Sequence, residues 1–180
     1  MGLRKSRPFK KNLEYGIIKK RLGAEIMTSD DWKDRLRIFF ESIEVLERCK
    51  QEARENFKQF CEFIAEPAFE ALAEEMKTYR VKSKFWTQKG SSTGIEFDFP
   101  GGGVDSFHYV IVLPKNAVQL KLRLQLKGRI SPRTPLEESE EAFMEKVPPD
   151  RVLKISKEEL LSDIVERFRN YIYAVLTSAK

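Results

Sequence analysis

Large apolar side chains recur at a near-heptad spacing between Trp32 and Ile64, and this is the strongest pattern in the chain. Capping and acidic residues at 28–31 precede it, as is typical of a helix start. A single helix to residue 64 would be about 50 Å long, so we expect either a break near Cys49 to Ala53 or a helix that extends beyond its own domain. The two apolar registers are Leu36, Ile43, Phe57 and Ile64, and Phe39, Leu46, Ala53 and Phe60, with Lys50 as the exception.

Two explanations of this spacing remain open. A helix that packs inside its own fold can keep nearly the same repeat as a dimerising coiled coil. The sequence therefore allows intramolecular packing, and it also allows a homodimer formed through residues 32–64.

A second helix is predicted from Pro67 to about Lys77–Tyr79, because proline is well tolerated in the first turn of a helix. The period of the pattern then changes to two. Short connections at glycine- and proline-containing turns separate the alternating segments, which predicts an antiparallel meander. The expected strands are 80–87, 94–99, 106–113 and 118–127.

Alternation separates the two faces of this sheet, and one face is strongly apolar. We expect the helices to pack on that face, which gives the fold class: an α+β domain with long N-terminal helices and a C-terminal helix on one side of a four- to five-stranded antiparallel sheet. The predicted core side chains are Val81, Phe85, Ile95, Phe97, Phe99, Phe107, Tyr109, Ile111, Leu113, Val118, Leu120, Leu122, Leu124 and Leu126.

Residues 131–150 are rich in proline and glutamate, which predicts an acidic connector with one turn of helix within 136–145. A short strand is expected at 152–155. Ser156 and Glu159 then form the S-x-x-E capping box that begins the last helix. The predicted organisation is a basic arm at 1–28 and a single domain at 29–180, with helices at 29–79, the sheet at 80–130, the connector at 131–150 and the last elements at 151–180.

Composition narrows the class of protein. The chain has 180 residues, of which 41% are hydrophobic and 34% charged, so it is too apolar for a disordered protein and too interrupted by charge for a membrane span. We therefore expect a cytoplasmic protein with two reduced cysteines, Cys49 and Cys61. Residues 1–22 carry eight basic side chains and one acidic side chain, so the basic character is concentrated in the predicted arm.

Local motifs for catalysis, metals or cofactors are weak. Ser106 and His108 share a strand face, but no oxyanion turn precedes the serine. The acidic pair Glu96 and Asp98 is better explained by cross-strand pairing with Lys82 and Lys84. The glycines at 101–103 lack the spacing of a nucleotide-binding loop. We predict no enzyme activity, no metal and no cofactor.

The expected function is therefore that of a non-catalytic protein-interaction or regulatory module with an unidentified protein partner. The alternative is a nucleic-acid-binding protein, because the second sheet face and the arm could track phosphates and one aromatic side chain could stack on a base. The residues predicted for that site are Arg80, Lys82, Lys84, Trp86, Lys121, Arg123 and Lys127.

Overall fold

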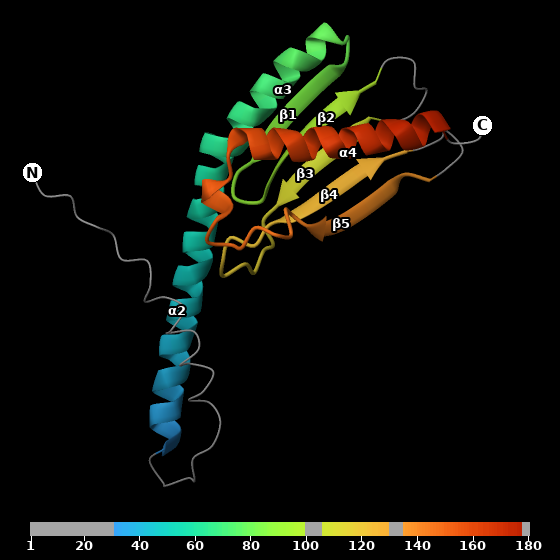
Figure 1. The fold of residues 1–180 in the computed structure, drawn as a ribbon. Coiled ribbons are helices and arrows are strands. Elements are labelled where there is room, and N and C mark those ends of the chain that lie inside the picture. The colour runs from blue at the N-terminus through green and yellow to red at the C-terminus, as the bar shows by residue number, and fades with distance from the viewer. Residues whose placement is uncertain (1–30, 100–105, 130–134, 178–180) are drawn as a thin grey trace, which may run out of the picture. The chain divides into compact units, whose positions relative to one another are not determined.

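The computed structural model describes residues 31–99, 106–129 and 135–177 (Figure 1). The expected arm at 1–28 and the glycine loop at 101–103 lie outside these residues. The chain divides into two compact units, Met1–Glu47 and Arg48–Lys180, and the division falls within the first described helix.

The helix α2 (Asp31–Phe60) continues without a break through Cys49 to Ala53, so the long unbroken helix is the one of the two expected alternatives that the structure has. One π-helical turn, η1 (Cys61–Ala65), separates it from α3 (Glu66–Thr78). Pro67 lies at the start of α3, as predicted. A proline has no N–H for the preceding turn and its ring crowds the carbonyl four residues earlier, which accounts for the wider turn just before it.

The sheet confirms the predicted fold class. Five antiparallel strands lie in sequence order, and β1 is hydrogen-bonded to β2 and so on to β5. In Figure 1, α4 crosses one face of this sheet. The strands are β1 (Lys82–Gln88), β2 (Ser92–Asp98), β3 (Phe107–Val112), β4 (Arg123–Gly128) and β5 (Glu137–Ala142).

Three details of the prediction need correction. The expected long strand at 118–127 is strand only from Arg123, and the residues before it form an irregular connection. The expected helical turn within the acidic connector is instead β5, which pairs with β4. The expected short strand at 152–155 is a 3₁₀ turn, η2 (Val152–Lys154).

The core lies between the predicted apolar sheet face and the helices. Phe57 and Phe60 at the end of α2 are fully buried, together with Phe69 of α3 and Leu160 and Ile164 of α4 (Lys157–Thr177). Most of the predicted core side chains of the sheet are also buried. The exceptions include Phe85 and Phe99, which remain 39% and 37% exposed.

The last helix begins and packs through specific polar contacts. At its start the Ser156 backbone N–H donates to Glu159 Oε2 at 2.7 Å and the Glu159 N–H donates to Ser156 Oγ at 3.1 Å, which confirms the capping box. The first of these bonds lowers the pKa of Glu159. Near its end, Tyr171 packs so closely on Gly128 that a Cβ at that position would overlap the ring.

Candidate functional site

The sheet face opposite the apolar core face, called the open face below, carries most of the residues predicted to bind nucleic acid. The strand register shows which residues surround them. Lys82 is opposite Asp98, and Lys84 is opposite Glu96. Each lysine of β1 therefore has a carboxylate as its cross-strand neighbour, which is the arrangement that electrostatic pairing favours.

Strand β5 adds further carboxylates to this face. Lys127 forms an ion pair with Glu138, and Arg123 donates a hydrogen bond to Glu140. Counted by register, the open face of the five strands carries equal numbers of basic and acidic side chains. The four basic residues are Lys82, Lys84, Arg123 and Lys127, and the four acidic residues are Glu96, Asp98, Glu138 and Glu140.

The structure therefore separates the predicted nucleic-acid site into parts. Lys82, Lys84 and Trp86 lie on β1, whereas Arg123 and Lys127 lie on β4, with two strands between them. Two residues lie outside the strands. Arg80 occupies the turn before β1 with a φ of 61°, and Lys121 belongs to the connection before β4.

Trp86 has a structural role on β1, an edge strand of the sheet. It packs over Gly94, where a Cβ would lie 3.0 Å from the indole ring. Its ring centre is 6.2 Å from that of His108, in an edge-to-face arrangement. The indole is 36% exposed, so part of its surface is used by these neighbours and not by a stacked base.

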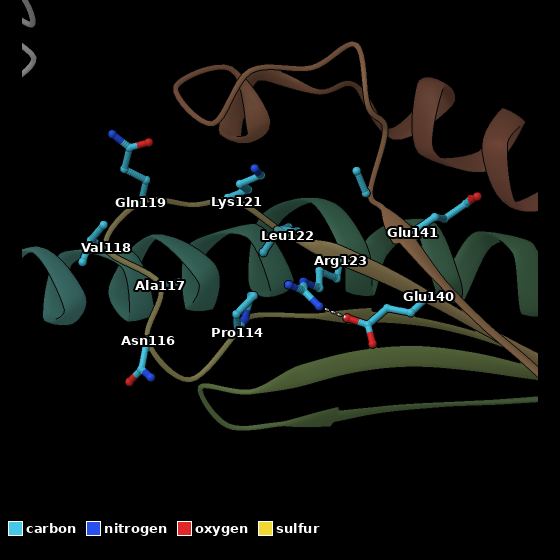
Figure 2. Close-up of a pocket in the computed structure, with 11 residues that line it drawn as sticks. Pro114, Asn116, Ala117, Val118, Gln119, Lys121, Leu122, Arg123, Glu140 and Glu141 are labelled. Atoms are coloured by element: carbon cyan, nitrogen blue, oxygen red, sulfur yellow. Dashed lines mark hydrogen bonds and ion pairs between the residues drawn. The ribbon is translucent and has the colours of Figure 1, made fainter.

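A groove of about 560 Å³ lies beside the connection before β4. Figure 2 shows Arg123 and Glu140 directed toward one another at this groove. This pair neutralises two of the four charged side chains that line the groove. Its lining residues are Pro114, Asn116, Ala117, Val118, Gln119, Lys121, Leu122, Arg123, Glu140, Glu141 and Ala142.

The candidate catalytic groups are engaged in structural contacts. The Ser106 hydroxyl donates a hydrogen bond to Asp98, and His108 lies against Trp86. Within the described part of the chain, no three His, Cys, Asp or Glu side chains cluster closely enough to hold a metal ion. Over the same ranges, no helix is long and apolar enough to cross a membrane.

A polar cluster that includes the buried Tyr109 joins the sheet to α4. The Tyr109 hydroxyl donates to Asp163 Oδ2 at 2.6 Å, and Arg167 pairs with Glu141 at 2.6 Å and with Asp163 at 3.8 Å. Burial raises the pKa of Tyr109 well above its ordinary value, and the neighbouring Asp163 charge raises it further. The tyrosine therefore stays protonated and acts as a hydrogen-bond donor, which holds α4 on the sheet.

The first half of α2 presents the most unusual surface among the described residues. Trp32, Phe39 and Phe40 are 57%, 56% and 55% exposed, and Leu36 is 47% exposed. At 100° per residue these four side chains fall on one arc of about 100°, and the arc widens to about 120° when Ile43 and Leu46 are included, which is typical of a helix face that packs against a partner. We call this surface the α2 stripe, consisting of the exposed Trp32, Leu36, Phe39, Phe40 and Ile43 and the half-buried Leu46.

The heptad spacing signalled this surface in advance, but the spacing could not show whether the apolar side chains were covered. Phe40 was outside both registers and was missed. The sequence marks Phe40 only by its place next to Phe39. In the structure the two ring centres lie 5.5 Å apart.

Comparison with known proteins adds no family assignment. No protein-family model matches the chain, and no curated protein or solved structure shows significant similarity to it.

Proposed function

We propose that this chain is a non-catalytic protein-interaction module whose binding surface is the α2 stripe. The observation that supports the proposal is the concentration of exposed aromatic and aliphatic side chains on one face of a single helix. Scattered apolar residues are ordinary on a protein surface, whereas a contiguous patch of large ones is typical of interaction sites.

The chemistry of the α2 stripe fits protein recognition. Trp32, Phe39 and Phe40 are of the residue types enriched at interface centres, where one buried aromatic side chain contributes several times the average contact. Fully burying a large apolar side chain contributes about 1.5–3 kcal/mol. Several such side chains on one arc favour a partner that supplies either an apolar groove or the apolar face of another helix.

A matched pair of variants tests this proposal. Phe39→Glu with Ile43→Glu places charge within the α2 stripe, whereas Glu44→Lys with Arg48→Glu alters exposed residues outside the stripe on the same helix and keeps the ion pairs of Arg37. We expect the first variant to lose bound proteins, including any self-association, and the second to keep them. Binding is measured by affinity capture with mass spectrometry and by sedimentation velocity. Equal binding by both variants and the unmodified chain would refute the proposal.

Nucleic-acid binding through the open sheet face is the less favoured function, because the acidic residues of β2 and β5 offset the basic ones. Fluorescence anisotropy with labelled DNA and RNA at two salt concentrations tests it. If the carboxylates mask a cationic site, Glu138→Gln with Glu140→Gln will raise the affinity and steepen its salt dependence. Unchanged, weak binding would leave the protein-interaction function as the better explanation.

A further inference from the structure

We infer that the partner of the α2 stripe is a second copy of this chain, bound as an antiparallel coiled coil. This inference rests on the proposed function and specifies its partner. The α2 stripe has a heptad repeat, and heptads are the pattern by which helices cover one another with interlocking side chains. The remaining question is which orientation and register the sequence favours.

The antiparallel arrangement has one register that uses the whole exposed segment. If the two-fold axis passes through position 41, Leu36 lies opposite Leu46 of the second copy and Phe39 lies opposite Ile43. Phe40 flanks the seam and lies about 3 Å along the axis from its own counterpart, on the same side of the seam. Each exposed apolar residue of the α2 stripe then faces another apolar residue, apart from Trp32.

Trp32 and Lys50 form the outermost pair of this register. In the antiparallel arrangement Trp32 lies opposite Lys50 of the second copy, where an indole ring and an ammonium group attract one another. In a parallel, in-register arrangement Lys50 would lie opposite a second Lys50 within the seam, where like charges repel. The polar residue that interrupts the repeat therefore favours the antiparallel form.

Flanking charges lead to the same choice. Positions 33 and 47 flank the antiparallel seam on the same side, about 3 Å apart along the axis, so Lys33 lies near Glu47 of the second copy twice in each dimer. In the parallel form the corresponding flanking pairs are Arg35 with Phe40 and Ser42 with Glu47, neither of which joins opposite charges. Charge complementarity of this kind sets orientation in coiled coils.

The mass of the protein in solution is the first test. Sedimentation equilibrium of the full chain should show a monomer–dimer equilibrium at micromolar concentrations. Ile43→Glu with Leu46→Glu should weaken it at least 100-fold, because each change buries charge in two layers of the seam. The variant Glu44→Lys with Arg48→Glu, outside the stripe, should change it less than threefold, about the scale of exposed charges.

A charge-swap cycle tests the register without disturbing the apolar seam. Lys33→Glu or Glu47→Lys alone should weaken the dimer about fivefold, as two exposed pairs become repulsive. The double swap should restore the original affinity. Within one helix these positions are about 21 Å apart, so their coupling can arise only between copies. Additive losses in the double swap would overturn the proposed register.

Distances between spin labels test the orientation directly. Labels are placed on Asp34→Cys or Glu41→Cys in a Cys49→Ser chain, where buried Cys61 has its pKa raised to about 12 and stays unlabelled. The antiparallel form places the two labels at 41 level with each other and those at 34 about 21 Å apart along the axis. Equal distances at the two sites would show a parallel dimer and overturn the inference.

The outcomes also separate this inference from the proposed function. A chain that stays monomeric at all concentrations, yet captures proteins that the Phe39→Glu and Ile43→Glu variant does not, refutes the second copy and supports the α2 stripe. A monomer whose captured proteins are unaffected by these changes refutes both.

Discussion

The two halves of α2 carry the same apolar repeat, but its side chains are mostly exposed in the first half and buried in the second. Phe39 in the first half is 56% exposed, whereas Phe57 in the second half is fully buried in the core of residues 48–180. Spacing, residue type and helix are the same in both halves. A heptad repeat therefore indicates that one face of a helix packs against other side chains. It does not indicate whether those side chains belong to the same chain or to another one.

The largest expected difference between the two halves is in hydrogen exchange. In dilute protein, amides between Arg35 and Leu46 should exchange through local opening that costs about 0–2 kcal/mol, because a short helix without packing is marginal. Amides around Phe57 should open only with global unfolding, at about 5–15 kcal/mol. Strong, concentration-independent protection of both halves would show that another part of the chain covers the α2 stripe.

Alanine substitutions compare the halves through stability. Phe57→Ala should lower the free energy of unfolding by about 3–5 kcal/mol, since it removes buried contacts and leaves a cavity. Phe39→Ala, made at a site already in contact with solvent, should change it by less than about 0.5 kcal/mol at low protein concentration. Urea unfolding followed by circular dichroism measures both. Similar losses would contradict the contrast in burial.

The alkaline stability of the protein reports on the buried end of this helical segment. Burial and, to a smaller extent, the Glu66 charge raise the pKa of Cys61 from 9.0 to about 12. Below pH 9 both folded and unfolded chains keep the thiol proton, so this contribution to stability is complete. Above pH 9 the unfolded chain loses the proton first, and stability should fall by about 1.4 kcal/mol per pH unit until about pH 12.

The variant Cys61→Ala isolates that contribution. It should lower stability by a constant amount at neutral pH and flatten the decline between pH 9 and 10. Above pH 10 the buried Tyr109, whose pKa is also raised, adds a second decline in both chains. Unfolding midpoints measured across this range give the slopes. Identical slopes for the two chains would show that Cys61 is more accessible to water than its position in the structure implies.

Sequence patterns predicted most of the fold, because most of its elements bury an apolar face with a regular period. The strand β5 is the clearest failure. Its sequence, Glu137–Ala142, is dominated by glutamate, which has low strand propensity and offers no apolar alternation. It forms a strand because the edge of β4 offers backbone partners and because Lys127 and Arg123 offer opposite charges. These interactions are distant in sequence and leave no local signal.

The limits of sequence patterns also affected the prediction of the candidate sites. The basic residues of the open sheet face follow from alternation, as does the pairing of Lys82 and Lys84 with carboxylates of β2. The pairing of Arg123 and Lys127, however, depends on the unpredicted β5. The α2 stripe was signalled by its heptads, but exposure is a property of the folded chain. Phe57 is buried against other elements of the fold whereas Phe39 is exposed, and the apolar spacing around the two residues is the same.

The smallest expected effect concerns what holds the exposed half of α2 together in the absence of a partner. Arg37 pairs with Asp34 at 3.1 Å and with Glu41 at 3.9 Å on the outer face of the helix. Arg37→Ala removes both pairs and keeps good helix propensity, so it should ease opening of residues 31–47 by about 0.3–1 kcal/mol, as molar salt should also do. Hydrogen exchange in dilute protein measures this change, and the urea midpoint should stay constant.

The matched control is Lys77→Ala, which breaks an exposed pair with Glu74 in α3. Because α3 is held by buried Phe69 and Leu72, amides in its packed turns should be unaffected by that control. Equal effects in the two helices would mean that packing protects the first half of α2 as well, and the contrast between its halves would disappear.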